Sequence, residues 1–385
     1  MTTIITDLPT ELLVKVFSFL PGKTLGNVCK TCSRFREAVN IDSIWQARCA
    51  TEYNFTQLEG WNSSYQDVYT KILVKYGSLI GLYQRDFKPY GGLANIKFDT
   101  GQMLVCEYLA PDNPHIKQPL KEQKIFSICI NKRGEAEVSC LKGYKGPHTC
   151  KLIRKNQKLK FKCQHIGHHR HPRGKEKELE EWLISKQEDF SDLSVMKFEE
   201  SYLQTGKYKF EPMDLPRPMR NIPIQPGLFK GHYGAHGIEI MHLSYDSEMK
   251  NILVLKITGD VNVPAMNVSL FVDLHRPMVL NLEQQESMHM LREMDTPDIP
   301  EENGPGFEPR HQPFMIPTGC FNRVQNIPQR CKYRFHGKGR IAGHGYHNPS
   351  LTPGHFVVFD DDTLGFMWME LLSFSMYSRV TEMFG

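Results

Sequence analysis

Residues 7–49 decide the first part of the fold and have the sequence DLPTELLVKVFSFLPGKTLGNVCKTCSRFREAVNIDSIWQARC. Apolar residues recur there at the spacing of amphipathic helices, and Pro21-Gly22 separates the first helix from the next. A three-helix unit of about forty residues has too little interior for all of its large side chains, so we expect some of them to face a partner. Packing on a neighbouring domain is the alternative. The large side chains are Leu8, Leu12, Val16, Phe17, Leu20, Leu25, Val28 and Trp45.

The sequence pattern changes after Gly77. Helical spacing ends with the segment Val68–Tyr76, and short runs rich in β-branched and aromatic residues then alternate with Gly, Pro, Asn and Asp. Such runs are typical of a barrel or a sandwich. Strands are expected at 79–83, 103–109, 125–130, 136–141, 238–243, 252–259, 268–274 and 355–361, and one helix at 175–186.

These patterns predict an α+β protein. We expect a small all-α unit at residues 1–50, a helical linker at 51–78, and a mainly β, barrel-like domain at 79–385. The segment Glu283–Pro309 carries eight acidic residues against one arginine, together with four prolines. Because such a composition buries little apolar area, we predict a mobile acidic loop at about 283–312.

Composition excludes several classes of protein. Lys and Arg number 47 against 43 Asp and Glu, which does not favour a nucleic acid or a membrane surface as partner. No window has the ~18 apolar residues that a membrane-spanning helix needs, and no secretory leader is recognisable. The ten cysteines are irregularly spaced, which favours reduced thiols or metal ligands. We therefore predict a protein of the cytoplasm, with the nucleus as a second location.

The stretch at 7–49 strongly resembles an F-box. The features that carry the resemblance are the Leu-Pro opening, the apolar helix, the pattern Leu-x-x-Val-Cys-x-x-Cys-x-x-Phe and a closing Trp45. The resemblance implies binding to the Skp adaptor, which connects an F-box protein to a cullin scaffold and a RING subunit. It also implies which residues face the adaptor, namely Leu8, Pro9, Leu12, Val16, Leu20 and Leu25.

The remainder of the chain is similar to one family of F-box substrate receptors of SCF-type ubiquitin ligases. The phrases that carry this similarity are KPYGGLANIKFD, CLKGYKGPHTC, PGLFKGHYGAHGIEIMHLSY, KITGDVNVPA and GRIAGHGYHNPSLTPGHFVVFDDDTLGFMWMELLSFSMYSRV. The similarity implies a non-catalytic receptor that marks proteins for proteasomal degradation in the cell cycle. Its implied ligands are protein C-termini (C-degrons), including a D-type cyclin tail and C-termini that end in a primary amide. A centrosomal pool is also implied, and the acidic loop is shorter than the family's.

A second motif gathers cysteines and histidines within some thirty residues. Four such ligands bind zinc tetrahedrally, and a stretch with little apolar content gains folding free energy from the metal. The alternative is a solvated basic loop, because Lys and Arg crowd the same interval. The family resemblance implies a structural zinc held by Cys140, His148, Cys163 and His169. The other candidates are Cys150, His165, His168 and His171.

Glycine-rich turns at 231–237, 258–260 and 337–345 form the third feature. No phosphate-binding loop or hydrolase motif accompanies them, so tight turns of a barrel are one interpretation and a substrate-binding site is the other. Asp260 follows Gly259 at the end of an apolar strand, where it either caps a turn or accepts a hydrogen bond from a terminal amide. Four further residues offer donors for the terminal carbonyl: Tyr233, His236, Arg340 and His344.

Two other functions remain open. A metal-dependent hydrolase or transferase would use the Cys/His loop with one coordination position left for water. A zinc-dependent RNA-binding protein would need a basic face with exposed aromatic residues, and only 151–173 offers the charge. The helix expected at 175–186 is acidic, which opposes nucleic-acid binding.

Overall fold

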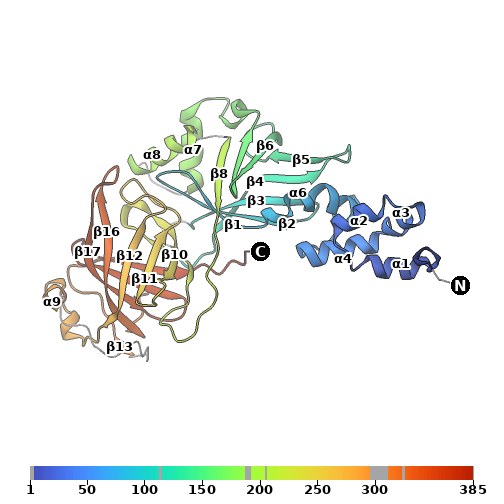
Figure 1. Cartoon of the computed structure of the whole chain (residues 1–385). Coiled ribbons are helices and arrows are strands. Elements are labelled where there is room, and N and C mark those ends of the chain that lie inside the picture. The colour runs from blue at the N-terminus through green and yellow to red at the C-terminus, as the bar shows by residue number, and fades with distance from the viewer. Residues whose placement is uncertain are drawn as a thin grey trace.

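The computed structural model of the chain describes residues 4–111, 115–186, 192–203, 206–294, 311–322 and 326–384. A group of helices forms one end, a first β-barrel lies in the middle, and a second β-barrel forms the other end (Figure 1). The predicted α+β class, with an all-α unit before a mainly β, barrel-like part, is confirmed. In the described ranges no helix is long and apolar enough to cross a membrane.

The N-terminal unit consists of η1 (Ile5–Asp7), α1 (Thr10–Phe17), α2 (Gly22–Val28), α3 (Ser33–Val39) and α4 (Asp42–Tyr53). Leu13, Phe17, Leu25 and Trp45 are buried between the helices. The Trp45 indole donates a hydrogen bond to the carbonyl oxygen of Val39 over 2.8 Å, which satisfies its N–H inside the core.

A second helical stretch connects this unit to the first barrel. It contains α5 (Tyr65–Asp67), η2 (Val68–Leu73), α6 (Val74–Tyr76) and η3 (Gly77–Leu79), so the helix predicted at 68–76 is confirmed. Val68, Ile72 and Leu73 are fully buried, and they belong to one continuous apolar core with Trp45 and with Phe126 of the barrel. The helices and the first barrel therefore share a single interior.

The first barrel is closed and antiparallel throughout. Its strands are β1 (Gly81–Arg85), β2 (Leu93–Asp99), β3 (Gln102–Leu109), β4 (Lys121–Ile130), β5 (Ala136–Cys140), β6 (His148–Lys155), β7 (Lys158–Cys163) and β8 (Lys207–Pro212), with β8 pairing back to β1. The alternation of strand side chains is clear in β7, where Leu159, Phe161 and Cys163 point inward and the intervening lysines point outward.

The second barrel also closes on itself. It is formed by β9 (Gly227–His232), β10 (Ile238–Tyr245), β11 (Asn251–Lys256), β12 (Val268–Pro277), β16 (Tyr333–Gly343), β17 (His347–Val358), β18 (Thr363–Trp368) and β19 (Ser373–Arg379). Pairing of β19 with β9 completes the circle, and β14 (Phe321–Asn322) adds in parallel to β19. β13 (Gln312–Pro313) pairs with β15 (Arg330–Cys331). The sequence analysis predicted one β domain where the structure has two barrels.

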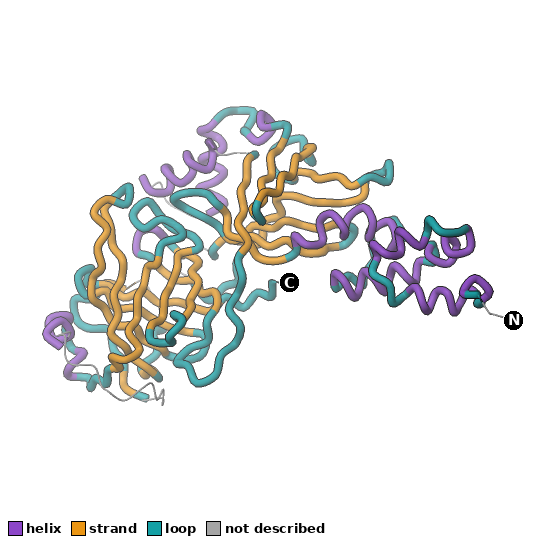
Figure 2. The backbone as a smooth tube through the Cα atoms, in the orientation of Figure 1, coloured by secondary structure: helices purple, strands orange, loops and turns teal. Residues whose placement is uncertain are grey.

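Helices also lie in the connections between the strands of both barrels (Figure 2). Between β7 and β8 lie η4 (Ile166–His169), α7 (Lys175–Lys186) and α8 (Asp192–Leu203), and α7 confirms the helix predicted at 175–186. The second barrel adds η5 (Gly234–His236), η6 (Glu283–Gln285) and α9 (Met288–Met294). The first part of the predicted acidic loop is thus helical, and 295–310 lie outside the described residues.

The barrels meet through two loops, 86–92 of the first and 257–265 of the second. Gly91 bridges to Thr258, and the Gly259 N–H donates to the carbonyl oxygen of Tyr90 over 2.9 Å. Gly91 has a φ of +65°, and a Cβ there would lie 2.3 Å from the carbonyl oxygen of Ile257. Only glycine allows this approach, which brings the turn containing Asp260 to the seam between the barrels.

Candidate functional site

The first candidate surface lies on α1. Leu12 and Val16 are 47% and 43% exposed, and Phe19 just beyond the helix is 75% exposed. Pro9 is exposed, and Leu8 and Leu20 are half-buried. The expected excess of apolar side chains in the N-terminal unit is therefore present at its surface, where no described residue covers it.

One of the predicted adaptor-facing residues, Leu25, does not lie at this surface. Leu25 has no exposed surface and packs in the core of the helical unit. The family resemblance suggested a role at the adaptor, whereas in this structure the apolar face of α2 that contains Leu25 is used for packing. Phe19, close to Leu12 and Val16 in the sequence, is an exposed residue that the sequence analysis did not select.

The second candidate site is the Cys/His cluster at the end of the first barrel. Cys140 ends β5, His148 begins β6 opposite it, Cys163 ends β7, and His169 lies in η4. One ligand atom from each residue lies within 4.8 Å of the others, and all four side chains are buried. These are the four residues predicted as zinc ligands. The group does not include Cys150, which lies opposite Cys163 on the neighbouring strand. It also does not include His165, His168 and His171.

The donor atoms of this cluster suit a metal ion. His148 Nε2 lies 2.8 Å from the carbonyl oxygen of Tyr144, so that nitrogen carries the proton and Nδ1 keeps a lone pair. His148 Nδ1 is buried and has no hydrogen-bond partner among the described residues. A buried acceptor without a partner is costly, and a cation bound between Nδ1 and the two sulfurs would satisfy it.

Burial also sets the protonation of the cluster. It raises the pKa of the Cys140 thiol to about 12 and lowers the pKa of His169 to about 4. Histidine 169 is therefore neutral and available as a ligand at physiological pH. A divalent cation held by this cluster would favour the thiolate form of its cysteine ligands, because its charge offsets the cost of burying a thiolate.

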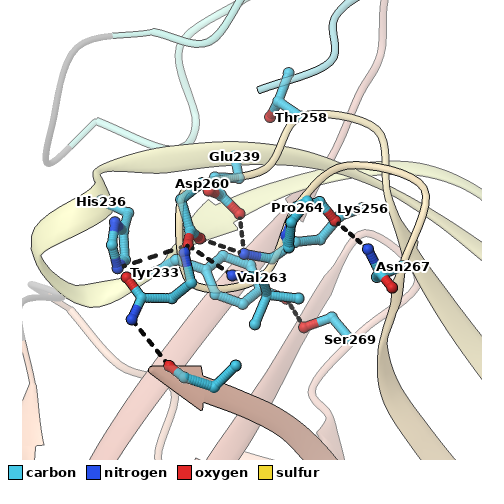
Figure 3. A network of polar contacts seen from close by, with 12 residues as sticks. Tyr233, His236, Glu239, Lys256, Thr258, Asp260, Val263, Pro264, Asn267 and Ser269 are labelled. Carbon is cyan, nitrogen blue, oxygen red and sulfur yellow. Dashed lines mark hydrogen bonds and ion pairs between the residues drawn. The ribbon is translucent and has the colours of Figure 1, made fainter. Parts of the chain in front are cut away.

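The third candidate site is a buried polar network in the second barrel (Figure 3). Lys256, at the end of β11, donates to Asp260 Oδ2 and lies beside Glu239 Oε2, in both cases over 2.6 Å. The Tyr233 ring lies beneath the same ammonium, 4.0 Å from Nζ to the ring centroid. His236 Nε2 is 3.8 Å from Asp260 Oδ1. One buried lysine therefore contacts two acidic side chains.

Asp260 also organises its own turn. Its Oδ1 accepts hydrogen bonds from the backbone N–H groups of Asn262 and Val263, over 2.6 and 2.8 Å. The interpretation that Asp260 caps a turn is therefore correct, and its ion pair with Lys256 comes in addition. One lone pair of Oδ2 remains for a further donor, although only 5% of the residue is exposed.

The two carboxylates have opposite pKa shifts. Burial raises the pKa of Glu239 to about 8, against the opposing effect of Lys256. For Asp260, the desolvation is outweighed by Lys256, His236 and the backbone donors, which lower its pKa to about 2. Asp260 therefore holds the negative charge of the network at neutral pH.

Three of the five predicted substrate-site residues come together here, namely Tyr233, His236 and Asp260. Arg340 lies in a neighbouring set of contacts, donating to the Val268 carbonyl over 2.8 Å and to the Tyr346 hydroxyl over 3.0 Å. His344 is exposed in the β16–β17 turn, and among the described residues it makes no hydrogen bond or ion pair with the network.

Lys256 and Glu239 were not selected from the sequence. Each is a charged residue inside an otherwise apolar strand, IEIMHL for Glu239 and ILVLK for Lys256. A charge at such a position is a recognisable signal, because ionised side chains are almost never buried unless they are paired.

Comparisons with known proteins follow the same division of the chain. A family model described as F-box-like matches residues 5–51, and one described as Cyclin D1 binding domain matches residues 210–383. F-box only protein 31 of Rattus norvegicus is 36% identical over 98% of this chain and 85% of its own length. The protein of that name from Homo sapiens is 34% identical over 98% of this chain and 83% of its own.

The Glu239 pKa predicts how stability changes with pH. Glu239 keeps its proton up to about pH 8 in the folded chain but loses it near its ordinary pKa of 4.5 when unfolded. The unfolded chain therefore binds fewer protons in this range, and stability falls as pH rises from about 5 to about 8. We expect the free energy of unfolding of Glu239→Gln, relative to wild type, to rise over that interval by more than about 1 kcal/mol.

Denaturant titrations at pH 5, 6, 7 and 8 measure this difference. The exposed Glu248 provides the control, because Glu248→Gln should leave the pH dependence unchanged. A relative stability of Glu239→Gln that stays constant or falls with pH would mean that Glu239 is ionised beside Lys256.

Proposed function

The chain belongs to the F-box only protein 31 family, and from that premise we propose that it is the substrate receptor of an SCF ubiquitin ligase. In this role it does not catalyse a reaction. It brings a target protein to the ligase, and the target is then ubiquitinated and degraded. The observation that carries the proposal is the uncovered apolar face of α1 on a helical unit that shares its core with the first barrel.

The adaptor arm is the face made by Leu8, Pro9, Leu12, Val16 and Leu20, to which we add Phe19. The Skp adaptor is the proposed partner, with cullin and RING subunits joined through it. Burial of large apolar side chains such as Leu12 and Val16 is worth roughly 1.5–3 kcal/mol each, which is sufficient for a stable contact of this kind.

The substrate arm is the second barrel. The match to a cyclin D1 binding domain covers this barrel, and it supports a D-type cyclin tail as a ligand. We propose that the network of Tyr233, His236 and Asp260 receives the last residue of a protein chain. Arg340 and His344, on the neighbouring β16–β17 hairpin, are the proposed contacts for residues that precede it.

The charge of the network favours a chain that ends in a primary amide. A terminal carboxylate brings a negative charge towards ionised Asp260 and offers no donor, whereas an amide is neutral and offers two N–H groups. The remaining lone pair of Asp260 Oδ2 would accept one of them. Lys256 does not reverse this preference, because Asp260 and Glu239 already occupy it.

The Cys/His cluster is the proposed site of one structural zinc. Two sulfurs and two imidazole nitrogens complete a tetrahedral shell, and all four residues are buried, which leaves no position for the water that a hydrolase or transferase requires. The metal would join the ends of β5, β6 and β7 to η4, where the chain has few apolar residues to hold it.

The first prediction of this proposal concerns the adaptor. Leu12→Glu combined with Val16→Glu should weaken binding of the purified Skp adaptor by more than about 100-fold, because two apolar contacts are replaced by charges. Titration calorimetry measures the affinity. The matched control is Val279→Glu with Leu282→Glu, which changes two residues of similar exposure on the second barrel and should not affect binding.

The second prediction concerns the metal. Freshly purified protein should contain about one zinc per chain by elemental analysis. Cys163→Ser should lose the zinc and make residues 141–174 sensitive to protease, because the metal replaces an apolar core there. Cys150→Ser is the control and should keep both the zinc and the protection. Zinc that survives Cys163→Ser but not Cys150→Ser would show that the set of ligands is wrong.

The third prediction concerns Asp260. Asp260→Asn removes the charge. It should therefore weaken the binding of a peptide that ends in an amide and strengthen the binding of the same peptide ending in a carboxylate. We expect the ratio of the two Kd values to change by about tenfold or more. Because the substitution also affects a turn and an ion pair, the melting temperature and adaptor binding are measured beside it. Equal binding of both peptides to the wild-type chain would contradict the proposed selectivity, and an unchanged ratio in Asp260→Asn would place it at other residues.

A further inference from the structure

Lysine is the main residue type on the outer face of β6, β7 and β8, where Thr149, Ile153 and Glu211 occupy the other outward positions. Strand alternation directs these side chains to the solvent, while Cys150, Leu159, Phe161 and Tyr208 fill the interior from the same strands. Each of these lysines is exposed. The residues of this lysine face are Lys151, Lys155, Lys158, Lys160, Lys162, Lys207 and Lys209.

The register of the strands places like charges directly opposite one another. Lys162 is the cross-strand partner of both Lys151 and Lys207, and Lys160 is the partner of Lys209. Like charges at opposed positions of an antiparallel pair destabilise the sheet. The face therefore does not contribute to stability in the unbound chain.

Acidic residues neutralise only part of the face. Lys158 pairs with Glu211, and Lys209 pairs with Asp86 over 3.5 Å. For Lys151, Lys155, Lys160, Lys162 and Lys207, the described residues provide no acidic partner. Five positive charges thus remain on a small area, at spacings of about 4.8 Å between strands and about 7 Å along each strand.

The lysine face is connected to the Asp260 network through one short loop. Asp86, the partner of Lys209, also donates its backbone N–H to the Lys209 carbonyl oxygen over 2.9 Å. The next residue, Phe87, packs with Tyr90 and Val261, and Val261 follows Asp260. The loop that carries Asp260 therefore contacts the loop that begins beside Lys209, at the edge of the lysine face.

We propose that the lysine face binds an acidic, extended segment of the substrate that precedes its captured C-terminus. This inference rests on the proposed function and adds to it a second contact, which selects substrates by charge. An extended chain presents alternate side chains about 7 Å apart, which matches the spacing of lysines along a strand.

The composition of the face favours an acidic polypeptide over a nucleic acid. Single-stranded nucleic acids are bound by grooves whose aromatic side chains stack on the bases, and the outward positions of β6–β8 contain no aromatic residue. Arginine recognises phosphates through two parallel hydrogen bonds, and on these strands it occurs only as the exposed Arg154, which donates to the Ser78 hydroxyl over 2.8 Å. Lysines act as point charges, which suits carboxylates at variable positions.

The test uses the full chain and two peptides with the same amidated last six residues. In one peptide, six glutamates precede this end, and in the other six serines precede it. Wild-type protein should bind the acidic peptide about tenfold more tightly, and the advantage should shrink as salt rises from 50 to 500 mM. The triple variant Lys151→Gln, Lys160→Gln, Lys162→Gln should lose the advantage and bind the serine peptide as wild type does.

The control is Lys30→Gln, Lys117→Gln, Lys132→Gln, which removes three exposed lysines elsewhere and should keep the advantage. Equal binding of the two peptides by the wild-type chain would overturn the inference while leaving the proposed function intact. Failure to bind either peptide would count against the proposed function itself. Tighter binding of a charge-matched poly-uridine than of the acidic peptide, lost in the triple variant, would show that the face serves RNA and would overturn the inference.

Discussion

The apolar core that begins at Leu13 and Trp45 continues without interruption through Val68 and Ile72 into the interior of the first barrel at Phe126. Glycine at position 22 is necessary for this continuity, because a Cβ there would lie 2.1 Å from the hydroxyl of Tyr69. That hydroxyl in turn donates to Glu52, whose other oxygen accepts from the Gly22 N–H. The contact fixes the orientation of the helical unit relative to the barrel. The helical unit, with its proposed adaptor face, and the first barrel thereby become parts of one body.

A second constraint acts where the barrels meet. Loops 86–92 and 257–265 approach so closely that glycine is required at position 91, where a Cβ would collide with the carbonyl oxygen of Ile257. Glycine is required at position 259 because the loop 257–265 folds tightly on itself, and a Cβ there would lie 2.2 Å from the backbone nitrogen of Ala265. The same loop contains Asp260, whose carboxylate holds the turn and pairs with Lys256. The candidate substrate site is therefore part of the joint between the barrels, and its geometry depends on that of the joint.

Much of the architecture was predictable from the sequence, because the apolar period changes from helical to alternating after Gly77. The eight predicted strands all exist, since each is a run of β-branched or aromatic residues. Several other strands were not predicted. Among them is β7, because its outward positions are lysines and only three inward residues carry the signal. The division into two barrels depends on which strands close each circle, and the pairing of β8 with β1 or of β19 with β9 leaves no local pattern. The Cys/His set could be predicted from composition and resemblance. Lys256 and Glu239, in contrast, are recognised as members of the network only when their burial is known.

Both barrels are closed, so every long strand has neighbours on both sides among the described residues. Many proteins capture an extended peptide by adding it as a further strand to a free sheet edge, where backbone hydrogen bonds supply affinity with little regard to sequence. Closure removes such an edge from each barrel. Recognition must then come from side chains at the barrel surface and from the loops at the seam. Under the proposed function, a ligand would be recognised by its terminus and its charge, and backbone pairing would not distinguish it from an internal segment of the same composition.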